Sequence, residues 1–156
     1  MLAKNSAISV LFLASCLCFS CSNDIVFCEF QSVPDKVWNK QSAFLFQFEL
    51  KDASVPYNIS LQLRNNAFYP YQNLWIYYEA NHNTEFAVKD TIEYLLADAS
   101  GRWTGNGITL FQNQFPLQTN YHFPDTGKYT IGIRHGMSDE RFSGIENIGL
   151  LVEKAR

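Results

Sequence analysis

The chain has few charges and no cluster of basic ones, with 12 Lys and Arg against 15 Asp and Glu in 156 residues. Nucleic-acid-binding domains and proteins that dock on anionic lipid by charge need such a cluster. Cysteine is scarce as well, because only Cys28 remains after residue 21. A single cysteine forms no internal disulfide, and the apolar neighbours of Cys28 predict a small strand residue rather than a reactive thiol. We therefore expect no nucleic-acid partner.

The sequence also lacks the motifs of common catalytic and metal sites. His82, His122 and His135 stand at no metal-ligand spacing, and only one cysteine remains to join them. No G-x-S-x-G is present, and the glycines of 101–107 are followed neither by Lys-Ser/Thr nor by a helix, as a phosphate loop requires. We expect no enzymatic activity, no catalytic residue, no metal and no cofactor. We interpret His82 as a loop residue and His135 as a surface residue at the end of a strand.

Helical periodicity is absent, and aromatic residues are dense, with 13 Phe, 8 Tyr and 3 Trp. Aromatic residues favour a pleated, half-buried surface. Apolar and polar residues alternate in Ala43–Leu50 and most strictly in Tyr57–Arg64, where Ser60 and Gln62 are expected to face outward. Leu74–Glu79 alternates little and is expected to be buried on both faces. The other expected strands are Ile25–Gln31, Thr84–Lys89 and Thr91–Leu96 (two strands, or one with a kink), Ile108–Phe111, Leu117–Phe123, Lys128–Arg134 and Ile148–Glu153.

About eight strands with turn signals between them predict an antiparallel β-sandwich, so the fold class we expect is all-β. The sequence leaves open whether the strand order is that of a jelly roll or immunoglobulin-like. Residues 21–156 contain no internal repeat, linker or low-complexity tract, and their number suits one domain. We therefore expect a single β-sandwich domain over 21–156.

Several aromatic residues lie near expected loops, where their rings are available for stacking on sugars. Core packing is the alternative interpretation, because aromatic residues at strand positions are usually buried. Carbohydrate binding in the cell envelope is thus a second functional hypothesis. The residues concerned are Trp38, Tyr69, Tyr71, Trp75 and Trp103.

The first 20 residues have the layout of an export signal. Lys4 gives a positive head, and Ala7–Ser20 is an uninterrupted run of apolar or small residues. The run is shorter than the roughly 20 apolar residues of a membrane span, and the layout is typical of a secretory signal peptide. Small residues leading into a cysteine resemble a bacterial lipobox, whose cysteine is lipidated and becomes the new N-terminus. We expect residues 1–20 to be a lipoprotein signal peptide.

A set of mostly turn-rich segments follows in a characteristic order. They are Gln31–Pro34, Trp38–Lys40, Arg64–Asn66, Tyr69–Tyr71, Asn73–Trp75, Asp90–Tyr94, Gly101–Trp103, Gly105–Gly107, Phe123–Ile131, His135–Met137 and Gly144–Gly149. In this order and at these spacings they resemble the GldH family, gliding motility lipoproteins of gliding bacteria and their non-gliding relatives. The resemblance implies a membrane-anchored lipoprotein on the periplasmic side of the cell envelope. It also implies a structural or assembly role, with envelope proteins of a gliding or secretion apparatus as partners.

The resemblance also bears on two modification sites. Leu-Ala-Ser precedes Cys16 and favours lipidation there, whereas the family's distance from cysteine to first strand favours Cys21. We expect Cys21 to carry the lipid, with Cys16 as the alternative. A thioether-linked diacyl group with an amide-linked chain such as palmitate would hold the protein far more firmly than one acyl chain. Asp90-Thr91-Ile92 resembles the O-glycosylation site of the same bacterial lineage, although Thr91 could instead be an ordinary strand residue.

Overall fold

The computed structural model describes residues 24–82 and 84–156, without the side chains of residues 81–89. The expected signal peptide, Cys16 and Cys21 lie outside the described residues. The described chain is almost entirely β-strand, with one short 3-10 turn at Pro34–Lys36. Its strands are β1 (Ile25–Ser32), β2 (Val37–Asn39), β3 (Phe44–Leu50), β4 (Tyr57–Asn66), β5 (Asn73–His82), β6 (Thr84–Leu95), β7 (Leu110–Tyr121), β8 (Gly127–His135), β9 (Arg141–Ser143) and β10 (Ile145–Lys154).

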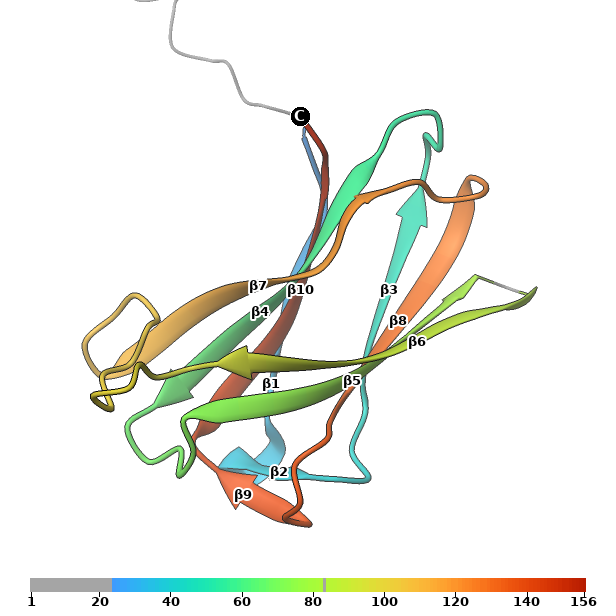
Figure 1. Ribbon diagram of the computed structural model, residues 1–156. Helices are drawn as coiled ribbons and strands as arrows, with labels where there is room; N and C mark the ends of the chain where they lie inside the picture. Colours follow the sequence, from blue (N-terminus) through green and yellow to red (C-terminus); the bar gives the residue numbers. More distant parts are fainter. Residues whose placement is uncertain (1–23, 83) are drawn as a thin grey trace, which may run out of the picture.

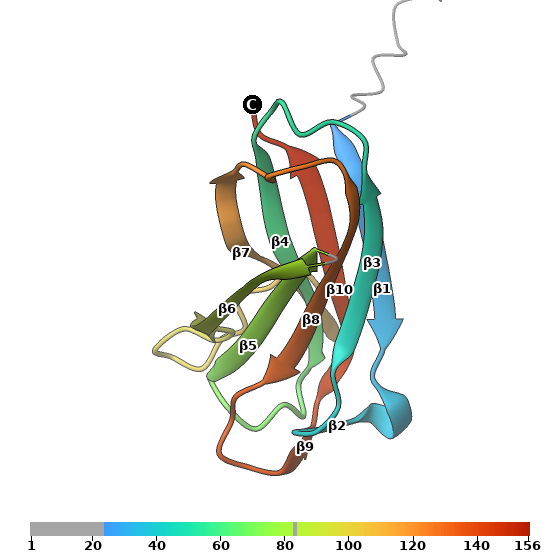
Figure 2. The ribbon, with the colours of Figure 1, turned by 90° about the vertical axis from the view of Figure 1, so that its right-hand side faces the viewer.

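The strand pairs are nested along the chain: β1 pairs with β10, β2 with β9, β3 with β8, β4 with β7, and β5 with β6. Such nesting arises when one long antiparallel ribbon folds over on itself, which gives a jelly roll. Two four-stranded sheets result, β1-β10-β4-β7 and β3-β8-β5-β6, named below the β1 sheet and the β5 sheet (Figures 1 and 2). The predicted antiparallel β-sandwich is confirmed, and its strand order is that of the jelly roll.

The core between the sheets follows the alternation of the strands. In β3, Phe44, Phe46 and Phe48 are buried while the residues between them are exposed, as the pattern predicts. In β4 the inward residues are buried, but Ser60 and Gln62 are buried as well. β4 is an inner strand between β10 and β7, whose side chains cover its outer face. Ser60 and Gln62 therefore face outward, as expected, but they are buried rather than exposed to solvent.

β7 is one strand of 12 residues, where the sequence predicted two short strands with a break between them. Pro116 lies inside it and donates no backbone hydrogen bond. β7 is the edge strand of the β1 sheet, and its register with β4 shifts next to Pro116. An edge strand tolerates proline because one side of its backbone has no partner strand. β6 likewise runs unbroken from Thr84 to Leu95. Of the two possibilities that the sequence left open here, two strands or one, the structure has one strand.

β2 and β9 pair as a small two-stranded ribbon, and neither is among the strands expected from the sequence. Trp38 and Phe142 from this ribbon are buried, with their rings packed against the ring of His135 at centroid distances of 5.3 and 4.6 Å. His135 is 1% exposed, so its predicted surface position was wrong. It continues the inward alternation of Ile131 and Ile133 in β8, and the ribbon covers it.

The two ends of the sandwich differ in what they carry. At the terminal end the backbone N–H of Lys154 donates to the carbonyl of Asp24 over 2.7 Å, so the two described chain ends are neighbours. β4 begins there, with Tyr57 opposite Lys154, and ends with Asn66 opposite Leu110. The β4–β5 loop, the β6–β7 loop and the β2–β9 ribbon therefore lie at the other end, named the distal end (Figure 1).

Candidate functional site

The distal end exposes large apolar side chains on its loops and strand ends. These are Phe68, Leu95, Ile108 and Leu110. Phe68 is 82% exposed in a turn where its backbone N–H donates to Asn66 Oδ1 over 2.8 Å. Ile108 is 91% exposed at the tip of a loop that Asn106 and Gln112 close with two backbone hydrogen bonds of 2.9 Å. Hydrogen-bonded turns thus hold apolar side chains out in water, a feature typical of contact surfaces.

The terminal end is closed by polar contacts instead. Lys154 Nζ lies 3.2 Å from Asp52 Oδ2, and the Ser54 hydroxyl and backbone N–H donate to Asp52 Oδ1 over 2.6 and 3.0 Å. The hydrogen bonds from Ser54, helped by Lys154, lower the pKa of Asp52 to about 2. Arg156 forms a further ion pair with Asp24. The end of the domain next to the leader is therefore charged and tied together.

Most of the aromatic residues in the carbohydrate hypothesis pack into or against the core. These are Trp38, Tyr69, Tyr71 and Trp103. Trp75, the fifth, is 38% exposed, and Tyr77 beside it is 43% exposed. The prediction that this strand is buried on both faces was wrong: Leu74 and Ile76 point into the core and the two rings point outward. Inward and outward positions do alternate in this segment. Because the outward positions are also aromatic, the sequence shows no contrast between apolar and polar residues.

A hollow of about 510 Å³ opens over these two rings. It is lined by Tyr71, Asn73, Trp75, Tyr77, Thr91, Gly136, Met137, Ser138 and Asp139. A second hollow of about 440 Å³ shares Tyr77 and Thr91 with it, so the two adjoin. Thr91 lies in β6 opposite Tyr77 and is exposed. The residue that resembles an O-glycosylation site is thus accessible, and its modification stays a prediction.

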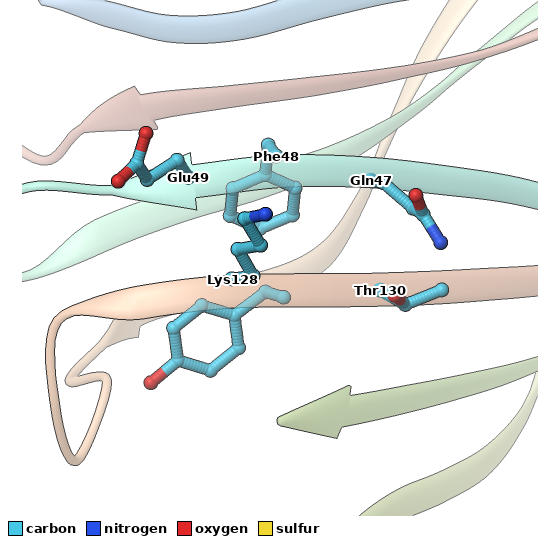
Figure 3. A pocket seen from close by; sticks show the side chains of 6 residues that line it. Gln47, Phe48, Glu49, Lys128 and Thr130 are labelled. Atoms are coloured by element: carbon cyan, nitrogen blue, oxygen red, sulfur yellow. The ribbon is translucent and has the colours of Figure 1, made fainter. Parts of the chain in front are cut away.

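A third hollow, of about 310 Å³, lies over β3 and β8. Figure 3 shows Gln47, Phe48 and Glu49 on β3 with Lys128 and Thr130 on β8. Glu49 pairs in register with Lys128, and Gln47 with Thr130. Phe48 belongs to the core. The lining is thus the ordinary polar surface of a sheet, with no assembly of nucleophile and base.

The histidines whose side chains the structure describes are His122 and His135. Within 24–82 and 84–156 no group of three or more His, Cys, Asp or Glu is placed to hold a metal ion. His122 is exposed, and the side chain of His82 is outside the description. Burial lowers the pKa of His135, and the charge of Lys40 lowers it further, while the Trp38 backbone and Glu140 oppose the shift. Neither ring nitrogen of His135 makes a hydrogen bond of ordinary geometry to a described residue, so it packs as a neutral ring.

Comparison with known proteins assigns the chain to a family. The model of the family described as GldH lipoprotein matches residues 25–152. The chain is 32% identical to the gliding motility lipoprotein GldH of Flavobacterium johnsoniae, in an alignment that covers 99% of each chain. The chain belongs to the GldH lipoprotein family. It is also 28% identical to the GldH homologue of Christiangramia forsetii, over 96% of this chain and 98% of that one.

Membership of the GldH family confirms the resemblance that the turn segments carry. As a member of a lipoprotein family, the chain is a membrane-anchored protein of the cell envelope. In the described part of the chain, no helix has the length and apolar character to cross a membrane. The family description names no reaction, and the expectation that the chain is not an enzyme stays a prediction.

Two turn glycines of the GldH family segments have clear structural reasons. Gly107 has φ of +144°, and a Cβ there would lie 1.9 Å from the Leu110 carbonyl oxygen. Gly105 lies against the side chain of Asn113, which a Cβ would meet at 2.7 Å. Trp103 is partly buried and packs against the core. These residues shape the β6–β7 loop, one of the two loops that carry the exposed apolar tips.

Proposed function

We propose that this protein is a lipid-anchored structural or assembly component of a gliding or secretion apparatus, facing the periplasm. In this proposal, residues 1–20 are removed and residues 21–156 form the mature lipoprotein. The names of the relatives support a link to gliding. The observation that carries the proposal is the difference between the two ends of the domain, with Asp24 and the C-terminal residues at the terminal end and exposed apolar loops at the distal end.

The position of the anchor sets how the domain meets the membrane. If Cys21 carries the lipid, four residues reach Ile25, and a chain of that length spans at most about 14 Å. The charged terminal end then lies next to the lipid headgroups. β4 runs from the terminal to the distal end in 10 residues, which extend over about 33 Å. The apolar loops therefore point away from the bilayer, toward a protein partner in the envelope.

Metabolic labelling with a fatty-acid analogue tests the anchor. We expect label on the wild-type chain and on Cys16→Ala, and none on Cys21→Ala. Label that survives Cys21→Ala and is lost in Cys16→Ala would show that Cys16 is the lipidated residue. Label on neither wild type nor either variant would contradict the lipoprotein assignment of the leader.

Photo-crosslinking in intact cells tests the distal end as the partner-binding surface. A photoreactive residue replaces Phe68 or Ile108, and the matched control replaces Thr126, which is exposed at the terminal end. We expect crosslinks to a discrete envelope protein from both distal positions and not from Thr126. Equal crosslinking from all three positions, or crosslinking from Thr126 alone, would contradict the proposed surface.

Glycosylation of Thr91 is a further proposal, supported by the exposure of its side chain in β6. Mass spectrometry of the peptide that contains Thr91 tests it in protein from the native cell. We expect a mass increase that corresponds to a glycan and that Thr91→Ala abolishes. An unmodified peptide would exclude the modification.

A further inference from the structure

Two aromatic rings stand side by side on the outer face of the β5 sheet. Trp75 and Tyr77 occupy alternate positions of β5 and so point to the same side of the sheet. They are exposed, whereas most of the described aromatic rings of the chain belong to the core or pack against it. An exposed flat ring offers an apolar surface on which the C–H face of a sugar ring packs while the sugar hydroxyls stay in water. The pair therefore has the form of a stacking platform.

The backbone beneath the rings holds this platform in place. Gly136 donates its N–H to the Trp75 carbonyl over 2.7 Å, and Trp75 donates its own N–H to Met137 Sδ over 3.3 Å. A Cβ at position 136 would lie 2.9 Å from the Tyr77 ring and 3.3 Å from the Trp75 Cβ. Glycine at 136 thus lets the Tyr77 ring lie directly against the backbone just after β8. Rings that are fixed before binding lose less conformational freedom when a ligand arrives.

Polar groups line the same hollow as the two rings. The side-chain amide of Asn73 donates to Glu93, and the hydroxyl of Tyr71 donates to Asp139. Each of these carboxylates keeps lone pairs that its partner does not use. The exposed hydroxyl of Thr91 lies opposite Tyr77. A few oriented polar groups beside aromatic surfaces are typical of ligand sites, and acceptors of this kind suit the hydroxyl groups of a sugar.

The site is extended rather than a single pocket. The hollows of about 510 and 440 Å³ adjoin at Tyr77 and Thr91, so a ligand is able to continue from one to the other. In the second hollow Arg134 lies 3.3 Å from Glu79, with Asp90 nearby in the lining. This shape fits a chain of several sugar units better than a monosaccharide.

Charge decides among the possible ligands. Among the residues whose side chains the structure describes, Asp139 is the one charged residue that lines the first hollow, and the single cation of the second, Arg134, is paired with Glu79. The resulting excess of negative charge disfavours anionic saccharides and nucleic acids. Two rings also give far less area than a stable protein interface, which buries about 800 Å² on each partner. We infer that Trp75 and Tyr77 form the stacking platform of a binding site for a neutral oligosaccharide.

Titration of purified, lipidated protein with defined oligosaccharides tests this inference. The detergent must be sugar-free, because a maltoside would compete for the site. The probes are cellohexaose, laminarihexaose and chitohexaose, with an oligogalacturonate as the anionic comparison. Isothermal titration calorimetry up to about 10 mM ligand measures binding in every variant, including Trp75→Ala, which lacks the fluorophore at the site. Trp75→Ala and Tyr77→Ala remove the rings, Tyr77→Phe keeps a ring, and Gly136→Ala displaces it. Phe68→Ala is the matched control for an exposed aromatic residue elsewhere.

We expect at least one neutral hexamer to bind, with a Kd raised tenfold or more by Trp75→Ala, Tyr77→Ala and Gly136→Ala. Tyr77→Phe and Phe68→Ala should leave the Kd within a factor of two to three. No binding of any neutral hexamer, unchanged binding by the ring-removing variants, or tighter binding of the oligogalacturonate would overturn the inference. A glycan attached to Thr91 would fill the hollow in the wild type and be absent from Thr91→Ala. Binding of a hexamer to Thr91→Ala alone would therefore show that this attached glycan is the native occupant, and it would overturn the inference. The inference does not depend on the proposed assembly role.

Discussion

Replacing His135 with phenylalanine should remove a pH dependence of stability that the native chain shows just below neutrality. The imidazole is 1% exposed and packs edge-on against Trp38 and Phe142, without a hydrogen bond of ordinary geometry to a described residue. Charging the ring there means losing its hydration, and Lys40 adds a repulsive charge, which together outweigh the favourable effects of the Trp38 backbone and Glu140. Burial therefore lowers the pKa of His135 in the folded state.

The sign and size of the effect follow from proton linkage. An unfolded histidine takes up its proton near pH 6.5, whereas the folded ring takes it up only at lower pH. Between these two pH values the unfolded state holds one more proton, so the free energy of unfolding falls by about 1.4 kcal/mol per pH unit of acidification. The loss begins near pH 6.5 and ends below the folded pKa. Between pH 7.5 and 5.5 it amounts to as much as about 1.4 kcal/mol.

Urea unfolding followed by tryptophan fluorescence at constant ionic strength measures this difference, with Cys21→Ser in every protein so that no lipid interferes. His135→Phe should lose markedly less stability than the parent between pH 7.5 and 5.5. Any overpacking by the larger ring changes the free energy of unfolding equally at both pH values, so it cancels in the difference between them. His122→Phe, at an exposed position, is the control and should keep the parental pH dependence. An equal loss in His135→Phe and the parent would refute the reasoning.

Four further substitutions test the packing and hydrogen bonds of loops and turns. Asn113→Leu removes the 3.0 Å hydrogen bond to a buried amide of β4, and urea unfolding should show a loss of about 1–3 kcal/mol. Gly144→Ala should lower the thermal unfolding midpoint strongly or prevent folding, because φ is +97° and the new Cβ would lie 2.3 Å from backbone atoms. Gly101→Ala, with φ of +81° and open space around it, should cost only the backbone strain of about 1–3 kcal/mol. Ser54→Ala should raise the pKa of Asp52 from about 2 toward 3.8 in an NMR titration, so that the stability lost on acidification through that range becomes smaller.

The fold could be predicted from sequence wherever a strand has one buried and one exposed face. Phe44–Leu50 and Gly127–His135 alternate cleanly because each lies in a sheet with a covered inner face. The ribbon of β2 and β9 could not be found in this way, since strands of three residues are too short to show a period. The single strand β7 was missed for another reason: whether a segment that contains a proline lies at the edge of a sheet depends on long-range pairing that local sequence does not contain.

The candidate sites, like the fold, were predicted from sequence only where they do not depend on long-range strand pairing. Trp75 was singled out from composition, but its partners were not, because Gly136 meets Tyr77 through the pairing of β5 with β8, far apart in the chain. His135 was misplaced since nothing in its neighbourhood predicts that β2 and β9 cover the end of β8. The lipidation site is the opposite case. It depends on residues read as a linear motif by the export machinery, so it is predicted from sequence and is independent of the fold.

The apolar loops and the stacking platform are neighbours rather than separate features of the domain. Asn73 lines the larger hollow, and it pairs in register with Leu95, one of the exposed apolar residues of the distal end. A partner protein bound over Phe68 and Ile108 would therefore reach the margin of the proposed sugar groove. If both proposals hold, binding of one ligand should change the affinity for the other, and linkage requires the effect to be reciprocal. Crosslinking yield from position 68 with and without the neutral hexamer measures this coupling, whereas independent sites would give equal yields.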